Sequence, residues 1–187
     1  MIKNKQIFIT GGAGFIANTL IRRLVDNNKI VIFDNFHRDT FSGSDLKDNQ
    51  NIQVIKGDVL DYDLVRKSMT GSDIVVHAAG IAGIDTVVKN PVLTGRVNVI
   101  GTANVLEAAK ENNVKDRVID FSTSEVFGSM AFRSSETDST VAGSAGEARW
   151  TYAVSKLAGE HLAHAYYKEY KLPCVTVRPF NVYGPGQ

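Results

Sequence analysis

Short apolar runs rich in β-branched residues alternate with longer stretches of helical periodicity along the whole chain. The runs that we interpret as strands cover residues 6–9, 29–33, 51–56, 74–78, 117–122 and 174–178. The stretches with helical spacing cover residues 15–27, 60–69, 92–110 and 150–170. Strands that are apolar throughout and separated by helices are typical of a parallel sheet covered on both faces. Right-handed crossovers between such strands give a doubly wound α/β domain, which is the fold that we predict.

Length and charge exclude several classes of protein. The 187 residues are enough for one domain with a sizeable core, and 43% of them are hydrophobic, which is too many for a disordered chain. The formal net charge is +1 and no basic run occurs, which disfavours nucleic acid as a partner. The N-terminal apolar run is too short for a signal peptide or a membrane span. We therefore expect a soluble, cytoplasmic protein with no membrane partner.

The sequence also disfavours a metal site. Cys174 is the only cysteine, so neither a disulfide framework nor a cysteine-based zinc site can form within the chain. His161 and His164 are three residues apart on a predicted helix, but no third ligand is evident. His77 ends an apolar run, and we interpret it as a packing residue. We expect no metal.

A glycine-rich segment joins the first predicted strand to the first predicted helix. Residues 10–17 read TGGAGFIA and fit the pattern G-x-G-x-x-G/A through Gly12, Gly14 and Ala17. Glycines permit a tight turn and a close approach of the backbone to a pyrophosphate, and the helix N-terminus directs N–H groups at the phosphates. The alternative is an ordinary tight turn, but the position within a βαβ unit favours dinucleotide binding of the Rossmann type.

An acidic residue follows at the end of the second predicted strand. Asp34 lies twenty residues beyond Gly14, where a carboxylate can accept hydrogen bonds from both hydroxyls of the adenosine ribose. The same charge repels a 2′-phosphate, so Asp34 predicts NAD rather than NADP as the cofactor. The alternative is a local turn formed by Asp34 and Asn35. Arg38 is the neighbour that argues for NADP.

Tyr152 and Lys156 stand four residues apart, on one face of the last predicted helix. A phenol with a pKa near 10 is a poor base at neutral pH, and an adjacent ammonium together with a cationic nicotinamide ring can lower that pKa. Tyr167 and Lys171 repeat the spacing near the helix end, where an exposed pair is the better interpretation. Tyr152 lies near the helix start, where the carboxyl ends of the strands and a cofactor are expected.

Two other segments follow predicted strands. Asp58 and Val59 are placed to border the adenine, although Asp58 could equally cap the next helix. Residues 122–128 read STSEVFG, and hydroxyls at a strand end can orient and polarise a substrate oxygen beside Tyr152. The alternative is ordinary turn-forming serine and threonine.

Together these residues resemble the extended short-chain dehydrogenase/reductase family, in its NAD-dependent nucleotide-sugar epimerase/dehydratase branch. The motifs that carry the resemblance are TGGAGFIA at 10–17, FDN at 33–35, GDVLD at 57–61, HAAG at 77–80, NVIGT at 98–102, STSEVFG at 122–128, YAVSK at 152–156 and RPFNVYGPGQ at 178–187. The resemblance implies an enzyme that holds NAD throughout turnover. It also implies oxidation of a sugar hydroxyl, usually at C4, to a ketone that then epimerises, dehydrates or decarboxylates.

The resemblance implies roles for particular residues. Tyr152 corresponds to the base, Lys156 to the residue that holds the nicotinamide ribose and lowers the tyrosine pKa, and Thr123 to the family's Ser or Thr. Asn98 resembles an asparagine that supports the lysine through water, and Asn181 resembles a residue that contacts the substrate diphosphate. The implied cofactor-binding residues are Gly11, Gly12, Gly14, Phe15, Ile16, Asp34, Asn35, Asp58, Val59, Ala78, Ala79, Gly80, Asn98, Ser122, Tyr152, Lys156 and Pro179. The implied substrate-binding residues are Thr123, Ser124 and Asn181.

The chain departs from the family pattern at several positions. Ala17 replaces the third glycine, and Phe127 replaces a tyrosine. Dehydratases of the family often carry Asp-Glu where this chain has Ser124 and Glu125. We interpret Glu125 as a catalytic residue that acts on C5 or a neighbouring group of the 4-keto sugar. The alternative is a loop acid without a role.

Family members are roughly twice as long as this chain, with a C-terminal lobe that binds the substrate. We expect residues 1–178 to form the NAD-binding domain and residues 179–187 to begin that lobe, which is otherwise missing from the chain. The helices at 92–110 and 151–170 resemble those of a dimer interface, so we expect a homodimer. Three alternatives stay open: a nucleotide-sugar decarboxylase, a reductase that releases its cofactor in each cycle, and a non-catalytic NAD-binding regulatory protein.

Overall fold

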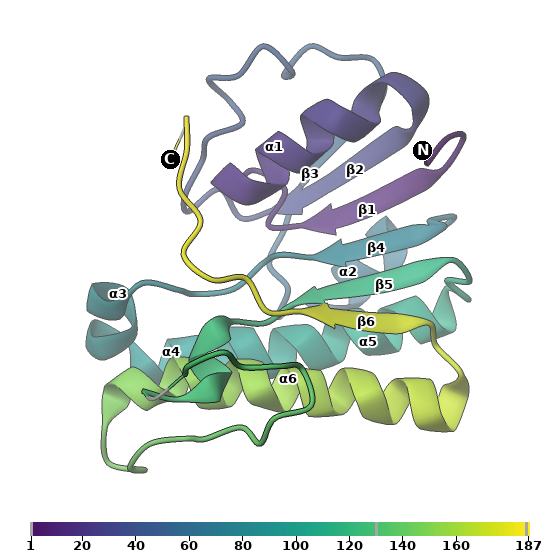
Figure 1. The fold of residues 1–187 in the computed structure, drawn as a ribbon. Helices are drawn as coiled ribbons and strands as arrows, with labels where there is room; N and C mark the ends of the chain where they lie inside the picture. Colours follow the sequence, from purple (N-terminus) through teal and green to yellow (C-terminus); the bar gives the residue numbers. More distant parts are fainter. Residues whose placement is uncertain (1, 130, 186) are drawn as a thin grey trace.

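The structure, a computed structural model, describes residues 2–129, 131–185 and 187. Within these residues, six parallel strands form one sheet in the order β3-β2-β1-β4-β5-β6, which Figure 1 shows. The strands are β1 (Gln6–Thr10), β2 (Lys29–Asp34), β3 (Ile52–Lys56), β4 (Ile74–His77), β5 (Arg117–Phe121) and β6 (Cys174–Val177). The order reverses between β1 and β4, which places the topological switch point at the carboxyl ends of these strands. The predicted doubly wound α/β fold is confirmed.

Helices cover both faces of the sheet, and the central strand β1 contributes side chains to two cores. Ile9 of β1 packs in a core with α1 (Phe15–Leu24). Phe8 points to the other face, into a core with α5 (Gly101–Glu111) and α6 (Ala148–Tyr170). Figure 1 shows α1 on one side of the sheet and the two longer helices on the other. Burial on both faces explains why the central strands β1, β2 and β4 are apolar along most of their length, whereas the edge strands β3 and β6 are partly exposed.

The remaining helical segments are short. They are η1 (Val25–Asn27), α2 (Tyr62–Ser68), α3 (Ile84–Lys89), α4 (Pro91–Gly95), the π-helical turn η2 (Arg96–Ile100) and the 3₁₀ turn η3 (Ser124–Phe127). The sequence predicted neither α3 nor η3. Its single helix over 92–110 is wrong in detail, because α4 begins at Pro91 and the π-helical turn precedes α5. Among the described residues, no helix is long and apolar enough to cross a membrane.

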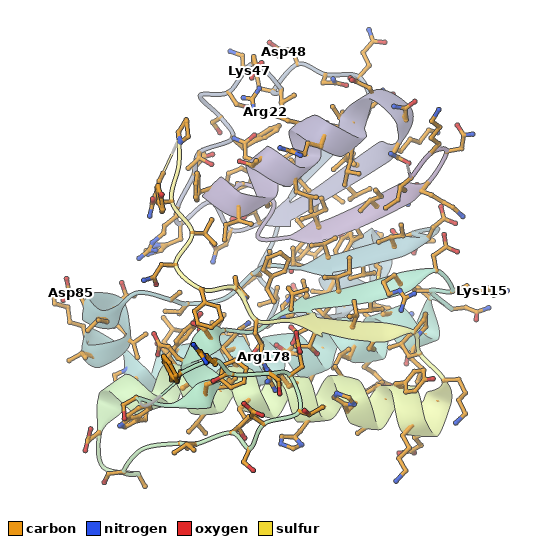
Figure 2. All side chains as sticks on the ribbon, viewed as in Figure 1. Arg22, Lys47, Asp48, Asp85, Lys115 and Arg178 are labelled. Carbon is orange, nitrogen blue, oxygen red and sulfur yellow. The ribbon has the colours of Figure 1, made fainter. Side chains whose placement is uncertain are left out.

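The long connection between β2 and β3 packs across α1 and braces the glycine-rich turn. Phe41 of this connection is buried against α1, and Asp45 pairs with Arg22 on the outer face of the helix. Both the backbone N–H and the hydroxyl of Thr40 donate to the carbonyl of Ala13, at 2.9 Å each. In Figure 2 the labelled Arg22 lies beside this connection, close to the labelled Lys47 and Asp48 at the edge of the molecule.

The described residues of the segment before α6 have no regular structure. Between Gly128 and Glu147 the described residues include neither helix nor strand. Helix α6 begins at Ala148. The segment is attached to the domain through the backbone N–H of Val141, which donates to the carbonyl of Val126 (3.0 Å).

Candidate active site

The glycine-rich turn packs so closely against its neighbours that side chains are excluded. Gly11 has a φ of +68°, and its N–H donates to the carbonyl of Phe33 (2.9 Å). A Cβ on Gly11 would lie 2.6 Å from the backbone nitrogen of Ala79, just beyond β4. A Cβ on Gly12 would lie 2.8 Å from the side chain of Ile32 on β2. Only glycine satisfies the conformation and the packing at Gly11.

The N-terminus of α1 opens directly on this turn. Gly14 is the N-cap residue, and among the described residues no side chain caps the helix. The first N–H groups of α1, including those of Phe15 and Ile16, lack carbonyl partners within the helix and are suited to a phosphate. The turn therefore fits the pyrophosphate of a dinucleotide in its shape and in its donors.

Asp34 ends β2 and fastens the glycine-rich turn. Its carboxylate accepts hydrogen bonds from the backbone nitrogens of Ala13 (3.0 Å) and Phe36 (2.7 Å). Burial raises the pKa of Asp34, and these two hydrogen bonds oppose the rise. Asp34 thus makes a local turn, with the N–H of Phe36, in addition to its contact with Ala13. Each carboxylate oxygen keeps a lone pair that can accept a ribose hydroxyl.

The side chain of Arg38 is engaged at the start of α3. Its Nη2 lies 3.3 Å from the carbonyl oxygen of Ala82 and 3.3 Å from the hydroxyl of Thr86. The guanidinium of Arg38, whose positive charge favours NADP, therefore already has hydrogen-bond acceptors on another segment.

The residues after β3 form a turn rather than a helix cap. Asp58 accepts a hydrogen bond from the backbone nitrogen of Leu60 (2.9 Å). The cap of α2 is Asp61, whose side chain accepts from Leu64. The alternative that Asp58 caps the helix is therefore wrong. Val59 is buried against Gly101 at the start of α5, where a Cβ would lie 2.6 Å from the valine side chain.

Tyr152 and Thr123 meet where α6 passes the end of β5. Burial raises the pKa of the Tyr152 phenol, a hydrogen bond with the Thr123 side chain opposes the rise, and the negative charge of Glu125 adds to it. Thr123 is buried, and its Oγ1 accepts a hydrogen bond from the backbone nitrogen of Glu125 (3.2 Å). The predicted lowering of the phenol pKa depends on an adjacent ammonium and a cationic nicotinamide ring. Within the chain itself, burial outweighs the hydrogen bond that lowers this pKa.

Lys156 is buried one turn further along α6, beside Gly80. A Cβ on Gly80 would lie 3.7 Å from the lysine Nζ and 3.1 Å from Oδ1 of Asn98. Asn98 accepts a hydrogen bond from the N–H of Ile81 (2.8 Å), and its Nδ2 donates to the Ile81 carbonyl (3.0 Å) and to Ser155 (3.1 Å). The π-helical turn thus holds Asn98 between the segment after β4 and α6. Burial lowers the pKa of Lys156.

A buried chain of hydrogen bonds runs through His77, a residue that the sequence suggested only for packing. Thr102 donates to the Asn98 carbonyl (2.7 Å), so Nε2 of His77 must donate to the Thr102 hydroxyl (2.9 Å). Nδ1 of His77 then accepts from Thr10 (2.7 Å), and the Thr10 hydroxyl accepts from the N–H of Ala79 (3.3 Å). Burial and the charge of Lys156 lower the pKa of His77 to about 3, so the ring is neutral.

The segment after β5 pairs with the segment after β6. The N–H of Ser122 donates to Val177 (2.8 Å), and the N–H of Ser124 donates to the carbonyl of Pro179 (3.0 Å). The hydroxyl of Ser122 is buried and has no hydrogen-bond partner among the described residues. Asn181 is exposed, and within the described part of the chain no hydrogen bond joins it to the other candidate residues.

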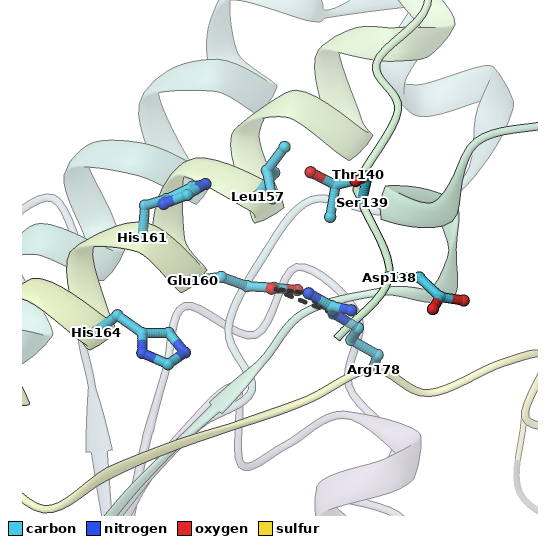
Figure 3. Close-up of a pocket in the computed structure, with 8 residues that line it drawn as sticks. All are labelled: Asp138, Ser139, Thr140, Leu157, Glu160, His161, His164 and Arg178. Carbon is cyan, nitrogen blue, oxygen red and sulfur yellow. Dashed lines mark hydrogen bonds and ion pairs between the residues drawn. The ribbon is translucent and has the colours of Figure 1, made fainter. Parts of the chain in front are cut away.

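A cavity of about 280 Å³ beside α6 has a different lining (Figure 3). Its residues are Asp138, Ser139, Thr140, Leu157, Glu160, His161, His164 and Arg178. None of these is a predicted catalytic or cofactor-binding residue, so this cavity is separate from the candidate site. The described residues include no group of three or more histidine, cysteine or acidic side chains arranged to hold a metal. The guanidinium of Arg178 also lies over the ring of Phe127, 4.8 Å from its centre. Phe127, which stands where the family pattern has a tyrosine, therefore has a packing role.

Comparison with known proteins gives matches over nearly the whole chain. A family model described as "NAD dependent epimerase/dehydratase family" matches residues 7–187. A UDP-N-acetyl-alpha-D-glucosaminuronate decarboxylase of Bacillus cytotoxicus is 36% identical, over 97% of this chain and 56% of that protein. A dTDP-glucose 4,6-dehydratase of Streptomyces niveus is 32% identical, over 97% and 55%. The crystal structure of UDP-glucuronic acid 4-epimerase from Bacillus cereus, in complex with UDP-glucuronic acid and NAD, matches with a TM-score of 0.86 and 35% identity, over 97% of this chain and 58% of that one. The chain therefore spans a little over half the length of these proteins.

Proposed function

The chain belongs to the NAD dependent epimerase/dehydratase family, and we propose that it forms the NAD-binding and proton-transferring part of an enzyme that acts on a nucleotide sugar. The observation that carries this proposal is the meeting of Tyr152 with Thr123, on the same helix as the buried Lys156 and at the same edge of the sheet as the glycine-rich turn. The named relatives are a decarboxylase, a dehydratase and an epimerase of nucleotide sugars, which supports this class of substrate.

NAD fits the residues at the switch point. The turn at Gly11 and Gly12 would hold the pyrophosphate at the N-terminus of α1, and Asp34 would accept hydrogen bonds from the adenosine ribose. Lys156, with its Nζ beside Gly80, would hold the nicotinamide ribose. When bound, NAD supplies the acceptor for the hydride that leaves the sugar carbon.

Tyr152 would take the proton of the sugar hydroxyl, most simply at C4. Thr123 would hydrogen-bond the same oxygen and hold it against the phenol. Because burial raises the pKa of Tyr152, the phenol needs a hydrogen-bond donor and a positive neighbour to lose its proton at neutral pH. Thr123 is the donor and Lys156 the positive neighbour in this proposal.

Glu125 would act in the second half of the reaction, on the 4-keto sugar. It is exposed at the 3₁₀ turn after β5, and its negative charge contributes to the raised pKa of Tyr152, which supports a position near the proposed reacting atoms. A base at this position suits removal of the C5 proton in a dehydratase. Simple epimerisation needs no such base, because the 4-keto sugar only has to rotate and take the hydride back.

Glu125→Gln is expected to separate the two halves of the reaction. NADH should still form when a UDP-, dTDP-, GDP- or CDP-sugar is added, because oxidation uses Tyr152 and Thr123. Product formation should fall by roughly 100-fold, the typical contribution of a positioned proton-transfer group. NADH fluorescence and chromatography of the nucleotide sugars measure the two steps separately.

Glu136→Gln is the matched control, since it neutralises another exposed acid in the irregular segment before α6. It should leave both steps unchanged. Full turnover of Glu125→Gln would exclude a role for this carboxylate and leave simple epimerisation as the better proposal.

The wild-type chain is expected to bind NAD more tightly than NADP. The carboxylate of Asp34 would face the 2′-phosphate of NADP, and the nearby guanidinium of Arg38 has acceptors on Ala82 and on Thr86 of α3. Fluorescence titration with each nucleotide measures the preference. Asp34→Ala should weaken NAD binding and reduce the difference between the affinities for NAD and NADP. A wild-type preference for NADP would show that Asp34 is wrongly assigned.

We also propose that the protein is a cytoplasmic homodimer, with a contact through residues 92–110 and 151–170. Exposed apolar side chains on these helices support the contact, among them Val92 on α4 and Val154 on α6. The division into a domain of residues 1–178 and the start of a substrate lobe at 179–187 likewise stays a prediction.

A further inference from the structure

Ionisable side chains gather in the interior between β5 and α6. Lys156 and Glu160 of α6 are 5% and 6% exposed, and Asp120 of β5 is 2% exposed. Arg178, which follows β6 and is labelled in Figure 2, reaches Glu160 from the neighbouring segment. Burying an ionised group is strongly unfavourable unless an opposite charge or several hydrogen bonds compensate it. Each of these buried charges therefore needs a compensating partner.

Glu160 forms an ion pair with Arg178. Nε of the guanidinium lies 2.9 Å and 3.2 Å from the two carboxylate oxygens, and Nη2 lies 2.6 Å from one of them. Figure 3 shows this pair bridging α6 and the segment after β6. A planar guanidinium that binds both oxygens of one carboxylate uses the charge of that carboxylate fully. Glu160 therefore neutralises Arg178.

Asp120 has no such partner. It pairs with His77 in the register of β4 and β5, and its side chain points toward α6, where a Cβ on Gly159 would lie 3.5 Å from Oδ2. Glycine at 159 thus leaves room for the carboxylate. Neither oxygen of Asp120 has a hydrogen-bond partner among the described residues, although both are buried.

We propose that Asp120 is the buried counter-charge of Lys156, a positioning residue that keeps the lysine an ammonium. The groups that face the lysine come from three elements. His77 on β4 is neutral, Glu160 on α6 is taken by Arg178, and Asp120 on β5 remains. Asp120 is the one negative charge among these facing groups that no other cation neutralises.

The directions of the pKa shifts agree with this pairing. Burial lowers the pKa of Lys156, and Asp120 is the largest influence that opposes the fall, ahead of Glu160. Burial raises the pKa of Asp120, and Lys156 is the influence that opposes that rise. Each group therefore favours the charged form of the other.

A double-mutant cycle on the cofactor-free chain tests the pairing through the unfolding free energy of Asp120→Asn, Lys156→Met and the double variant. Each single change should destabilise the fold, since it leaves one buried charge without its partner. If the two single effects were independent, their sum would predict the folding equilibrium constant of the double variant. We expect the measured constant to be at least roughly tenfold larger than that additive value. Additive effects would overturn the proposal.

Glu160→Gln provides the matched control, because it removes the other buried acid of the cluster. In the same kind of cycle, the effect of Glu160→Gln on the unfolding free energy should depend strongly on Arg178→Met and only weakly on Lys156→Met. Coupling of Lys156 to Glu160 that exceeds its coupling to Asp120 would assign the counter-charge to Glu160 and overturn the proposal.

A titration of the lysine itself covers the case in which a variant does not fold. In lysine-labelled protein, the side-chain NMR signal of Lys156 is assigned with Lys156→Arg and followed against pH. Asp120→Asn, or Asp120→Ser in its place, should lower the pKa of Lys156 by roughly one unit, as expected for the loss of a close opposite charge. An unchanged pKa, or a neutral lysine at pH 7 in the wild type, would refute the pairing.

The catalytic consequence of this pairing rests on the proposed function, in which the ammonium of Lys156 assists Tyr152. Both measurements need neither substrate nor NAD. Failure of the pairing is therefore seen directly in the cycle and the titration, whereas failure of the proposed reaction is seen only in turnover.

Discussion

Replacing Tyr152 with phenylalanine is expected to lower turnover of a nucleotide sugar by at least about 100-fold, while NAD still binds. The change removes the group that takes the hydroxyl proton and keeps the ring that fills the space beside Thr123. The pyrophosphate and adenosine sites lie on the glycine-rich turn and β2, which the substitution does not touch. Steady-state rates and NAD titration measure the two effects.

Tyr167→Phe is the control, because it removes the same hydroxyl from an exposed side chain further along α6. It should leave turnover nearly unchanged, and equal losses at the two positions would mean that the proton acceptor is elsewhere. The raised pKa of Tyr152 also sets the direction of the pH dependence. Because the phenolate is the active form, the wild-type rate should increase as pH rises toward that pKa.

Gly11→Ala is expected to destabilise the fold by roughly 3 kcal/mol and to abolish measurable NAD binding. The left-handed backbone at Gly11 disfavours any side chain, and the added methyl carbon would lie 2.6 Å from a backbone atom of the segment after β4. The turn and that segment would have to move apart, which also displaces the N-terminus of α1. Chemical denaturation and NAD titration measure the loss.

Gly43→Ala is the matched control for this prediction. Nothing lies within 4 Å of a Cβ built at Gly43, in the connection between β2 and β3. The substitution should change neither stability nor NAD affinity appreciably. A stable, NAD-binding Gly11→Ala variant would contradict the assignment of the turn as a pyrophosphate cradle.

The sheet could be predicted from sequence because its central strands β1, β2 and β4 are buried on both faces, which leaves a nearly unbroken apolar run in each. Helix α3 escaped prediction for the opposite reason. Ile84 and Val88 are two of its apolar side chains, and they are 75% and 51% exposed, so the segment has no buried stripe to detect. The π-helical turn also escaped, because its extra residue is positioned by the hydrogen bonds of Asn98 with Ile81 and not by a periodic pattern.

The sequence indicated which residues gather at the site better than it indicated their electrostatics. Motif spacing brought Tyr152, Thr123 and Lys156 to one edge of the sheet, since parallel strands end together. The depth of burial depends on the whole fold, so the raised pKa of Tyr152 could not be anticipated. Asp120, whose side-chain oxygens have no hydrogen-bond partner among the described residues, was not predicted from the sequence. An acid inside an apolar run gives no sign of which charge it faces.

The hydrogen-bond chain through His77 has a fixed direction, and this limits where protons can travel. The hydroxyl of Thr102 donates its hydrogen to the carbonyl of Asn98, and the hydroxyl of Thr10 donates its hydrogen to the ring of His77. A proton added to His77 would leave the Thr10 hydroxyl without an acceptor. The chain ends at the backbone N–H of Ala79 and at the backbone carbonyl of Asn98, and neither group releases or takes up a proton readily at neutral pH. These hydrogen bonds therefore give His77 no route for exchanging a proton with water.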